Sequence, residues 1–440
     1  MPARDNPLFG TDGIRGRWGT PPIDPVSITR LGHALDTVLG PCRLLVGEDP
    51  RESSAWIRDH LLGGMSARIE AGVCGVIPTP GLSWALRNGD WDWGVMITAS
   101  HNPWMDNGIK LFSGDGSKAD DEVERLVTEA FHASDSEPAA GAGRDIVPVA
   151  DGYADALAGW GAGLDGNGIS LVIDAANGAT AKFAADLFPA LGYAVDLRHA
   201  QPDGRNINEN CGATRIDVLQ AAVFETGADL GITFDGDGDR ALFVNADGGV
   251  ISGDHVLFAL AGAIHDDPAR YPAGVVGTVM SNMGLEAELK RRKIEFRRAG
   301  VGDRDVARVM RRTGFILGGE PSGHTIYFPL QPTGDGLLTA LLLLRELGRD
   351  PAEAGVRLCR KMTWFAQETR SVSVEERRDL ESWPELERFR RRIDDRHGNR
   401  VRLLIRYSGT EPRLRLMAEA ETDELVRAVL DELEDLVRNG

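Results

Sequence analysis

The sequence predicts an α/β protein built from three similar mixed α/β domains and a smaller α+β domain at the C-terminal end. At 440 residues the chain is about three times as long as a typical domain. Strand and helix patterns recur three times in the same order, and each time a strand runs into a polar loop. From about Trp364 the order of the patterns changes, which indicates a fourth domain of another kind.

The first predicted unit begins at Cys42. Its apolar pattern predicts a strand (RLLV), an amphipathic helix from Glu52 to Gly72, a strand (VCGVI) and a helix (GLSWALRNG). A strand (WGVMI), a polar loop and a further strand (IKLF) complete it. This order is a βαβαβ unit closed by a loop and one more strand.

The same order returns twice. The second unit runs from Leu171 through a helix at Ile216 to Glu225, a strand (DLGITF), a polar loop and a strand (ALFV). The third starts near Val275 and contains a helix from Asp303 to Arg312, followed by FILGG, a polar loop and TIYF. The small, polar segment from Asp135 to Gly143 is typical of a connection between units. We therefore expect domains at 1–150, 151–250, 251–363 and 364–440.

Three polar loops occupy the same place in the three units. They are TASHNPWMDNG from Thr98, DGDGDR from Asp235 and GEPSGH from Gly319. Ligands of parallel α/β sheets bind outside the carboxyl ends of the strands. If the three units pack symmetrically, these loops face one central cleft.

Composition narrows the class of protein. A net charge of −18 disfavours a nucleic acid or an anionic membrane as partner, so any phosphate must be bound by a local site. The N-terminal stretch lacks an apolar signal core and no apolar run has membrane length, which predicts a cytoplasmic protein. The four cysteines form no CxxC pair and predict buried free thiols, with neither a disulfide framework nor a zinc site.

The DGDGDR loop predicts a site for a hard divalent cation. Asp235, Asp237 and Asp239 place a carboxylate at every second position, separated by glycines that let the backbone curl around one centre. A calcium loop of EF-hand type requires glycine at position six and glutamate at position twelve, where this chain has Arg240 and Ala246. An acidic solvated turn is the remaining alternative.

The TASHNP loop offers a nucleophile. Ser100 follows a strand directly, with His101 and Lys110 nearby. A serine hydroxyl needs a base, a metal or positive charge for activation. The same residues also suit a helix cap or a turn, and the absence of GxSxG argues against serine hydrolase chemistry.

Two further loops suit a sugar phosphate. RYSGTEPRLRL combines Arg406 and Arg415 with hydroxyls and a glycine, the groups that a phosphate dianion requires. GEPSGH offers Glu320, Ser322 and His324 for sugar hydroxyls, although a glycine-rich turn with an ion pair explains it equally well. Isolated arginine pairs, such as the one at Arg391, are typical of solvated helix faces.

The chain resembles the phosphohexomutase family, and within it the bacterial phosphoglucosamine mutase subgroup. The resemblance rests on FGTDGIRG, TASHNPWMDNGIKLF, NINENCGATRIDVLQ, DGDGDRALFV, VGDRDV, GEPSGH, TGDGLLTALLLL and RYSGTEPRLRLMAE, in the expected order over essentially the whole chain. It implies a four-domain protein with a central cleft that moves a phosphoryl group between two oxygens of one hexose phosphate.

The resemblance also implies roles for the loop residues. It implies that Ser100 carries a phosphoryl group, that one Mg²⁺ is held by Ser100, Asp235, Asp237 and Asp239, and that a sugar bisphosphate acts as intermediate and activator. Glu320, Ser322 and His324 would contact the sugar, and Arg406, Ser408, Gly409, Thr410 and Arg415 its phosphate. Arg15 and Arg240 would neutralise the transferring group.

Several points stay open from the sequence. Many relatives carry a lysine where this chain has Gly300, so Lys110, His101 and His324 are the candidates for the general base. Pro321 stands where phosphoglucosamine mutases more often have glutamine, and Tyr407 stands where proline is usual. Glucose phosphate or mannose phosphate is the alternative substrate. A serine-dependent phosphatase or a non-catalytic sugar-phosphate binder is the alternative function. Both a monomer and a homodimer are compatible with the sequence.

Overall fold

The structure is a computed structural model that describes residues 8–134, 145–265, 274–374, 377–407 and 413–439. The predicted connection at Asp135 to Gly143 lies outside these ranges. The chain divides into two compact units. One contains Met1–Thr278 and Ile294–Lys361, and the other contains Val279–Lys293 and Met362–Gly440.

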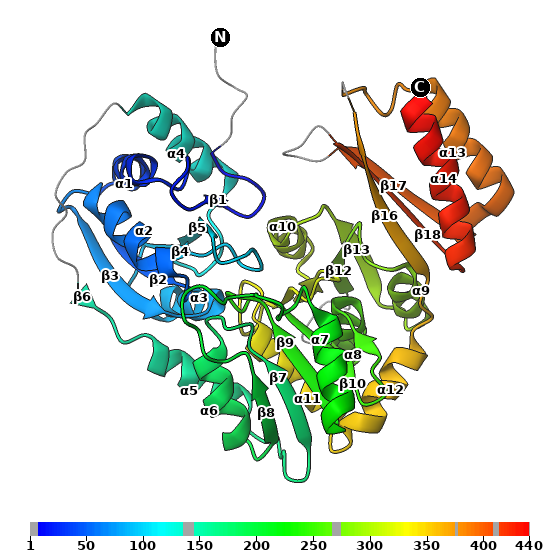
Figure 1. The fold of residues 1–440 in the computed structure, drawn as a ribbon, viewed down its shortest axis with the longest axis horizontal. Coiled ribbons are helices and arrows are strands. Elements are labelled where there is room, and N and C mark those ends of the chain that lie inside the picture. Colours follow the sequence, from blue (N-terminus) through cyan, green and yellow to red (C-terminus); the bar gives the residue numbers. More distant parts are fainter. Residues whose placement is uncertain (1–7, 135–144, 266–273, 375–376, 408–412, 440) are drawn as a thin grey trace. The chain divides into compact units, whose positions relative to one another are not determined.

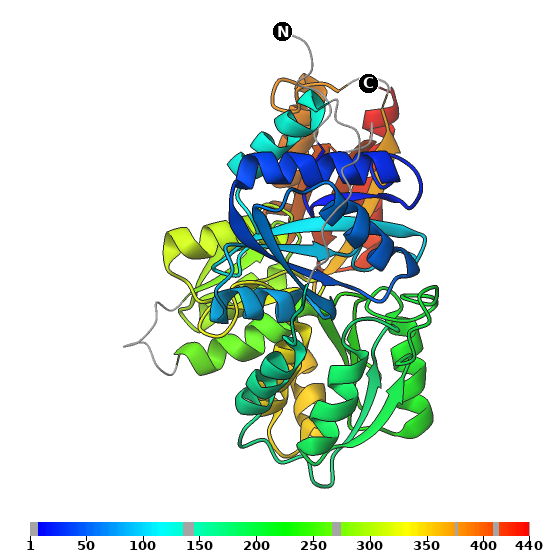
Figure 2. The ribbon, with the colours of Figure 1, turned by 90° about the vertical axis from the view of Figure 1, so that its left-hand side faces the viewer.

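The first sheet has the strand order β1-β5-β4-β2-β3-β6. Its strands are β1 (Ile14–Arg17), β2 (Cys42–Glu48), β3 (Ile69–Val76), β4 (Trp93–Ile97), β5 (Asp106–Ser113) and β6 (Asp145–Ile146). Its helices are α1 (Pro25–Leu39), α2 (Glu52–Gly63), α3 (Thr79–Asn88) and α4 (Asp121–Ala133), which Figures 1 and 2 show around the sheet. Val46 joins the core under α1, α2 and α4, whereas Met96 lies near Leu82 of α3, so both faces are covered.

Two more sheets complete the first unit. The second has β7 (Ser170–Asp174), β8 (Ala194–Arg198), β9 (Leu230–Phe234), β10 (Ala241–Asn245) and β11 (Val250–Ile251), and the third has β12 (Gly274–Thr278), β13 (Glu295–Ala299), β14 (Leu317–Gly319) and β15 (Thr325–Tyr327). The accompanying helices are α5 (Ala150–Trp160), α6 (Ala181–Ala190), α7 (Ile216–Thr226), α8 (Gly253–His265), α10 (Asp303–Thr313), α11 (Gly336–Leu347) and α12 (Pro351–Lys361).

The three sheets share one topology, which confirms the predicted repeat. The central orders are β3-β2-β4-β5, β8-β7-β9-β10 and β13-β12-β14-β15. In each, the first three of these strands run parallel and the last is antiparallel. The loops with Ser100, Asp235 and Glu320 therefore occupy the same connection, between the third core strand and its antiparallel neighbour.

The second unit is the α+β part of the chain. Its antiparallel sheet has the order β16-β18-β17, formed by Ala366–Ser373, Arg413–Ala420 and Val401–Tyr407. Helices α13 (Pro384–His397) and α14 (Asp423–Asn439) share a core with this sheet. Helix α9 (Met283–Arg291) belongs here, because Asn282 donates to Phe365 O and Arg402 donates to Val279 O.

We propose domain boundaries near those expected from the sequence, at 1–150, 151–250, 251–363 and 364–440. One adjustment is needed, because β11 pairs with β10 and runs to Ile251. We place the end of the second domain after that strand.

Two details of the first domain differ from the sequence prediction. The helix expected from Glu52 to Gly72 ends at Gly63, and Ile69–Val76 forms β3 instead. The helix stops where α2 crosses α1 so closely that a Cβ at Gly64 would lie 2.1 Å from Thr29 O. Helix α1, which precedes the first predicted strand, was not expected; the Asp24 carboxylate caps it by accepting from the N–H groups of Val26 and Ser27.

All four cysteines are free, as predicted, but the prediction that they are buried holds for Cys211 alone. Cys42, Cys74 and Cys359 are partly exposed. Within the described ranges, no helix combines the length and the apolar character needed to cross a lipid bilayer.

Replacing Gly32 by alanine should destabilise the first domain. An added Cβ would meet Leu61 O at 2.1 Å and Gly64 Cα at 3.0 Å, so α1 and α2 would have to separate. We expect a loss of about 1 to 3 kcal/mol, measured by urea unfolding. Gly159→Ala in α5, where nothing lies within 4 Å, is the matched control and should be neutral or stabilising by about 0.4 to 1 kcal/mol. Equal stability of the two variants would contradict the close packing.

Candidate active site

Ser100 lies in a buried, strained loop after β4. Its φ angle is 52°, in the left-handed region that few residues other than glycine adopt, and its side chain is buried. The hydroxyl donates to Asp235 Oδ2 at 2.6 Å, and the backbone N–H donates to Thr98 Oγ1 at 2.9 Å. Backbone strain of this kind persists only where the surroundings fix it, and it marks functional loops.

Arg51 holds the Ser100 loop through the backbone carbonyl groups of that loop. Its buried guanidinium pairs with Asp49 at 2.9 Å and donates to the carbonyl oxygens of Ser100 and Asn102 at 2.9 and 2.8 Å. The Asn208 side chain donates to the same two carbonyls at 2.9 and 3.0 Å. Because both carbonyl groups are satisfied from two directions, the serine is positioned before any ligand arrives.

The three aspartates of DGDGDR follow the buried strand β9 and are themselves buried. Gly236 brings their loop against the serine loop, since a Cβ at this position would lie 2.6 Å from Ser100 O. One ligand oxygen from each of Asp235, Asp237 and Asp239 lies within 4.8 Å of the others. The structure thus brings together Ser100 and the acidic loop, which the sequence analysis singled out separately.

The donor set fits a hard divalent cation. Asp237 Oδ1 and Asp239 Oδ1 are buried and accept no hydrogen bond from the described residues. Burial, followed by the charges of Asp239 and Asp237, raises the pKa of Asp235 well above its usual range. Clustered carboxylate oxygens of this kind are the ligands that Mg²⁺ prefers.

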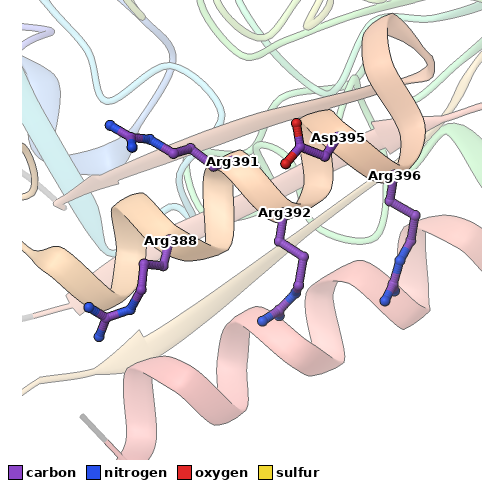
Figure 3. Close-up of a pocket in the computed structure, with 5 residues that line it drawn as sticks. All are labelled: Arg388, Arg391, Arg392, Asp395 and Arg396. Carbon is purple, nitrogen blue, oxygen red and sulfur yellow. The ribbon is translucent and has the colours of Figure 1, made fainter.

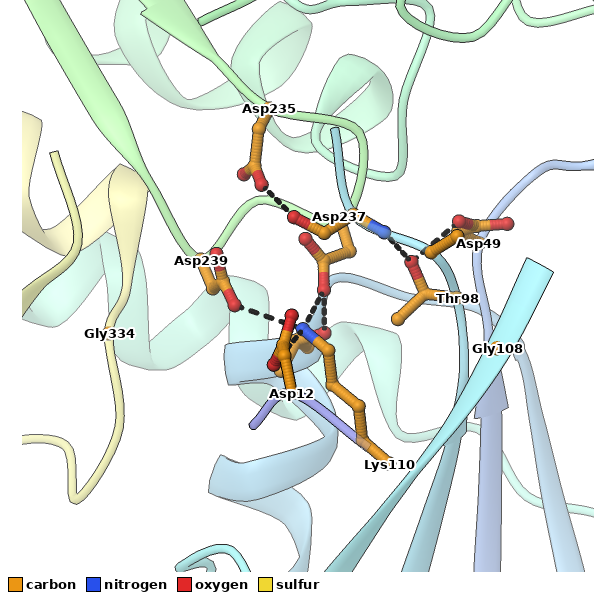
Figure 4. A network of polar contacts seen from close by, with 12 residues as sticks. Asp12, Asp49, Thr98, Gly108, Lys110, Asp235, Asp237, Asp239 and Gly334 are labelled. Carbon is orange, nitrogen blue, oxygen red and sulfur yellow. Dashed lines mark hydrogen bonds and ion pairs between the residues drawn. The ribbon is translucent and has the colours of Figure 1, made fainter. Parts of the chain in front are cut away.

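Lys110 points from β5 into the acidic cluster, as Figure 4 shows. Its ammonium donates to Asp237 Oδ2 at 2.8 Å and Asp239 Oδ2 at 3.1 Å, and lies 3.6 Å from Asp12 Oδ1. Burial alone would lower the pKa of Lys110, but the three carboxylates raise it well above its usual value. Lys110 is therefore a fixed positive charge beneath the aspartates.

Two arginines and a histidine border the serine. Arg15 donates to Ala99 O at 2.8 Å and pairs with Asp12. The Arg240 guanidinium lies 3.3 Å from His101 Nδ1, and this nitrogen lies 3.4 Å from Ser100 Oγ. Burial and the positive charges of Arg240 and Arg15 lower the pKa of His101 to about 4.

The GEPSGH loop adjoins the acidic loop through the backbone. Arg240 and His324 form a β-bridge, and the buried His324 ring has its Nδ1 3.6 Å from Asp239 Oδ1. Gly334 N–H donates to His324 Nε2 at 3.1 Å, which leaves the Nδ1 proton facing the aspartate. Glu320 accepts from Gly302 N–H at 3.0 Å, while Ser322 is exposed at the turn.

The structure adds three residues to which the sequence analysis gave no role. Lys118 donates to Asp12 Oδ1 at 2.6 Å and Asp303 Oδ1 at 2.9 Å, and His324 Nε2 lies 3.5 Å from Asp303 Oδ2. Asp12 belongs to the FGTDGIRG motif and Asp303 to VGDRDV. The presence of these two motifs in the sequence was therefore the signal that could have pointed to both aspartates. The ion pair between Lys118 and Asp303 ties the first domain to the third.

Arg406 and Arg415 of the RYSGTEPRLRL segment lie in the second unit. Arg406 on β17 and Arg415 on β18 are direct register partners, and neither forms an ion pair with a described residue. Like charges opposite each other destabilise a sheet unless an anion compensates them. Burial and the charge of Arg415 lower the pKa of Arg406. Ser408, Gly409 and Thr410 lie outside the described residues.

A shallow basic pocket on α13 is not a rival site. It is lined by Arg388, Arg391, Arg392, Asp395 and Arg396 (Figure 3). The arginines pair with Glu385, Glu387 and Glu432 on α13 and α14. As the sequence predicts for Arg391, this is a solvated helix face with compensated charge.

The chain matches family models of all four domains of one family. They are described as phosphoglucomutase/phosphomannomutase alpha/beta/alpha domain I (residues 6–138), domain II (151–248), domain III (252–360) and the C-terminal domain (371–436). A phosphoglucosamine mutase of Pseudomonas savastanoi pv. phaseolicola is 41% identical over 441 residues, covering 98% of both chains.

Solved structures show the same fold. A phosphoglucomutase/phosphomannomutase family protein from Burkholderia thailandensis has a TM-score of 0.82 and 24% identity, covering 98% of this chain and 97% of its own. An Aspergillus fumigatus N-acetylphosphoglucosamine mutase, in complex with GlcNAc-6P and magnesium, has a TM-score of 0.70 and 19% identity, covering 98% and 96%.

Lys110→Met should destabilise the protein strongly when divalent cations are absent. The change leaves Asp12, Asp237 and Asp239 without their shared cation, and an uncompensated buried charge costs about 3 to 5 kcal/mol. Thermal unfolding should show the loss in chelator and a smaller loss in excess Mg²⁺, since the ion replaces part of the missing charge. Lys182→Met, at an exposed position of α6, is the control. A deficit that Mg²⁺ does not reduce would argue against cation binding at these carboxylates.

Proposed function

Since the chain belongs to the phosphoglucomutase/phosphomannomutase family and is a phosphosugar mutase, we propose that it interconverts glucosamine 6-phosphate and glucosamine 1-phosphate. The observation that carries the proposal is the strained, buried Ser100, whose hydroxyl lies 2.6 Å from Asp235 in a three-aspartate site. The full-length similarity to a phosphoglucosamine mutase supports the choice of sugar.

We assign one Mg²⁺ to Ser100, Asp235, Asp237 and Asp239. Their buried carboxylates supply oxygen ligands, and two of the oxygens have no hydrogen bond from the described residues. When bound, the ion supplies positive charge at the serine phosphate, which favours phosphoryl transfer.

The chemistry begins with a phosphoryl group on Ser100 Oγ. The free hydroxyl of the sugar phosphate attacks the phosphorus, a new P–O bond forms, and the bond from phosphorus to Oγ breaks. The product is a sugar bisphosphate, which turns around and returns its other phosphoryl group to Ser100. We assign acceptance of the proton of the attacking hydroxyl to His101, because its lowered pKa keeps the ring neutral. Lys110 already holds its proton between Asp237 and Asp239, and both ring nitrogens of His324 are engaged, so these two candidates fit the role less well.

The neighbouring cations neutralise charge on the transferring group. Arg15 reaches the serine loop at Ala99 O, and Arg240 lies beside His101, whose Nδ1 is 3.4 Å from Ser100 Oγ. Lys110 fixes two of the ligand carboxylates from the opposite side. A phosphoryl group with charge on three oxygens is stabilised by such preorganised positive groups.

We assign sugar recognition to Glu320, Ser322 and His324. Capture of the non-reacting phosphate is assigned to Arg406, Ser408, Gly409, Thr410 and Arg415. The facing pair of Arg406 and Arg415, for which the described residues supply no ion pair, supports this role, because a phosphate dianion would relieve its repulsion. We further propose that a sugar bisphosphate acts as activator by restoring phosphoserine, that the enzyme works in the cytoplasm, and that it needs no nucleic acid or membrane partner.

Ser100→Ala should abolish mutase turnover without unfolding the protein. The covalent intermediate needs Oγ, and the loop keeps its anchors at Arg51 and Asn208 because both bind the backbone carbonyl. Intact-mass measurement should show a single phosphoryl adduct on the wild-type protein and none on the variant. The exposed Ser373→Ala should retain both adduct and turnover. Turnover close to wild type in Ser100→Ala would refute the assignment, and phosphate release as fast as isomer formation would favour a phosphatase.

Glucosamine 6-phosphate should be the preferred substrate. We expect kcat/KM for it to exceed those for glucose and mannose 6-phosphates by roughly tenfold or more, since one hydrogen bond to the 2-substituent is worth about 1 kcal/mol and unpaired polar groups add to the discrimination. Pro321 offers no side-chain amide for such a bond, so the contact must come from elsewhere in the loop. A tenfold preference for glucose or mannose phosphate would make this a phosphoglucomutase or phosphomannomutase of the same mechanism.

A further inference from the structure

A second cluster of metal-ligating side chains lies in the second domain, formed by residues other than the three aspartates. It consists of Asp174, His199 and Cys211, each of which places one ligand atom within 4.8 Å of the other two. The residues come from three separate segments, which the fold brings together.

The parallel pairing of β7 and β8 creates the cluster. Asp174 ends β7 and pairs in register with Arg198, so the next residue, His199, follows at the same edge of the sheet. His199 Nδ1 lies 3.1 Å from Asp174 Oδ1. Cys211 is delivered by the loop after β8, which is fixed because Gly212 N–H donates to Asp174 Oδ2 at 2.9 Å.

The Cys211 sulfur is the ligand atom of this cluster that the described residues leave unused. Cys211 is 0% exposed, and its thiol makes no hydrogen bond within the part of the chain that the structure describes. His199 Nδ1 faces Asp174 Oδ1 at 3.1 Å, so two of the ligand atoms are already in contact, and 33% of the His199 side chain is exposed. The site thus combines buried ligands with a path from solvent.

The backbone around the cluster is held in an unusual conformation. Ala176, Asn177, His199, Asn208 and Asn210 all have positive φ angles between 47° and 58°. Each of these conformations costs free energy, and several in one place indicate that the surrounding structure enforces a particular arrangement of side chains. A full burial of the Cys211 sulfur excludes the alternative of a cysteine nucleophile, because no substrate reaches it.

We propose that Asp174, His199 and Cys211 bind one divalent transition-metal ion of the zinc class. One oxygen, one nitrogen and one sulfur ligand suit Zn²⁺ or Co²⁺ and disfavour Mg²⁺, which selects oxygen ligands. Three protein ligands leave a fourth position for water. Binding replaces the S–H bond of Cys211 by a sulfur–metal bond and releases one proton to solvent.

The site has a structural connection to the serine loop. Asn208, on the segment between His199 and Cys211, donates to the carbonyl oxygens of Ser100 and Asn102, and its own N–H donates to Ala176 O. An ion that joins Cys211 to Asp174 therefore fixes the segment that holds Ser100 in place. The ion acts through position and touches no reacting atom.

The test uses Co²⁺ as a spectroscopic probe on the full-length protein, in excess Mg²⁺ that occupies the aspartate site. We expect one equivalent of Co²⁺ to bind, with a near-ultraviolet thiolate-to-cobalt absorption band and release of one proton, and Zn²⁺ to displace it. Cys211→Ser should abolish the band, while Cys74→Ser, at a partly exposed cysteine on β3, should keep it.

His199→Gln gives an independent variant that leaves the buried positions intact, and it should weaken Co²⁺ binding by roughly tenfold or more. The proposal is overturned if the folded wild-type protein shows no thiolate band, or if the band survives in Cys211→Ser. Loss of mutase turnover has no bearing on either result, because the readout is metal binding.

Discussion

The buried carboxylates of Asp235, Asp237 and Asp239 impose the constraint on which the first unit depends. Three carboxyl groups in a low-dielectric interior resist carrying charge together, and burial with the charges of Asp239 and Asp237 raises the pKa of Asp235 well above its usual range. Lys110 lies between Asp237, Asp239 and Asp12 and compensates part of this charge. Asp237 Oδ1 and Asp239 Oδ1 remain without a hydrogen bond from the described residues. These two oxygens are available to coordinate a divalent cation.

The charge network also explains how three domains cooperate. Lys110 comes from the first domain and Asp237 and Asp239 from the second, so the Lys110 ammonium group joins the two domains. Lys118 extends the chain of charges from Asp12 to Asp303 in the third domain. Removing a member of such a network leaves its partners buried and unpaired, which makes the network a condition for the stability of the first unit as well as for chemistry.

The repeated units and the positions of their three polar loops could be predicted from local sequence. The repeated strand and helix patterns gave the correct topology because hydrophobic periodicity is a local property, and the loops after β4, β9 and β14 were located because they interrupt it. The pairing of Lys110 with Asp237, of Lys118 with Asp303, and of Cys211 with His199 depends on contacts between distant segments. No spacing rule reveals these contacts. The overextended second helix was wrong because its end is set by the crossing with α1.

The strained serine links the two parts of the site. A residue at φ 52° returns to an ordinary conformation unless its neighbours prevent it, and here Arg51 and Asn208 prevent it by binding the same carbonyl oxygen. Arg51 is fixed by the buried Asp49, whereas Asn208 is fixed by the loop that reaches Cys211. One anchor of Ser100 thus depends on an ion pair within the first domain and the other on the second domain. Because both anchors hold the backbone carbonyl, Ser100 Oγ is kept facing Asp235 by contacts that the protein itself supplies.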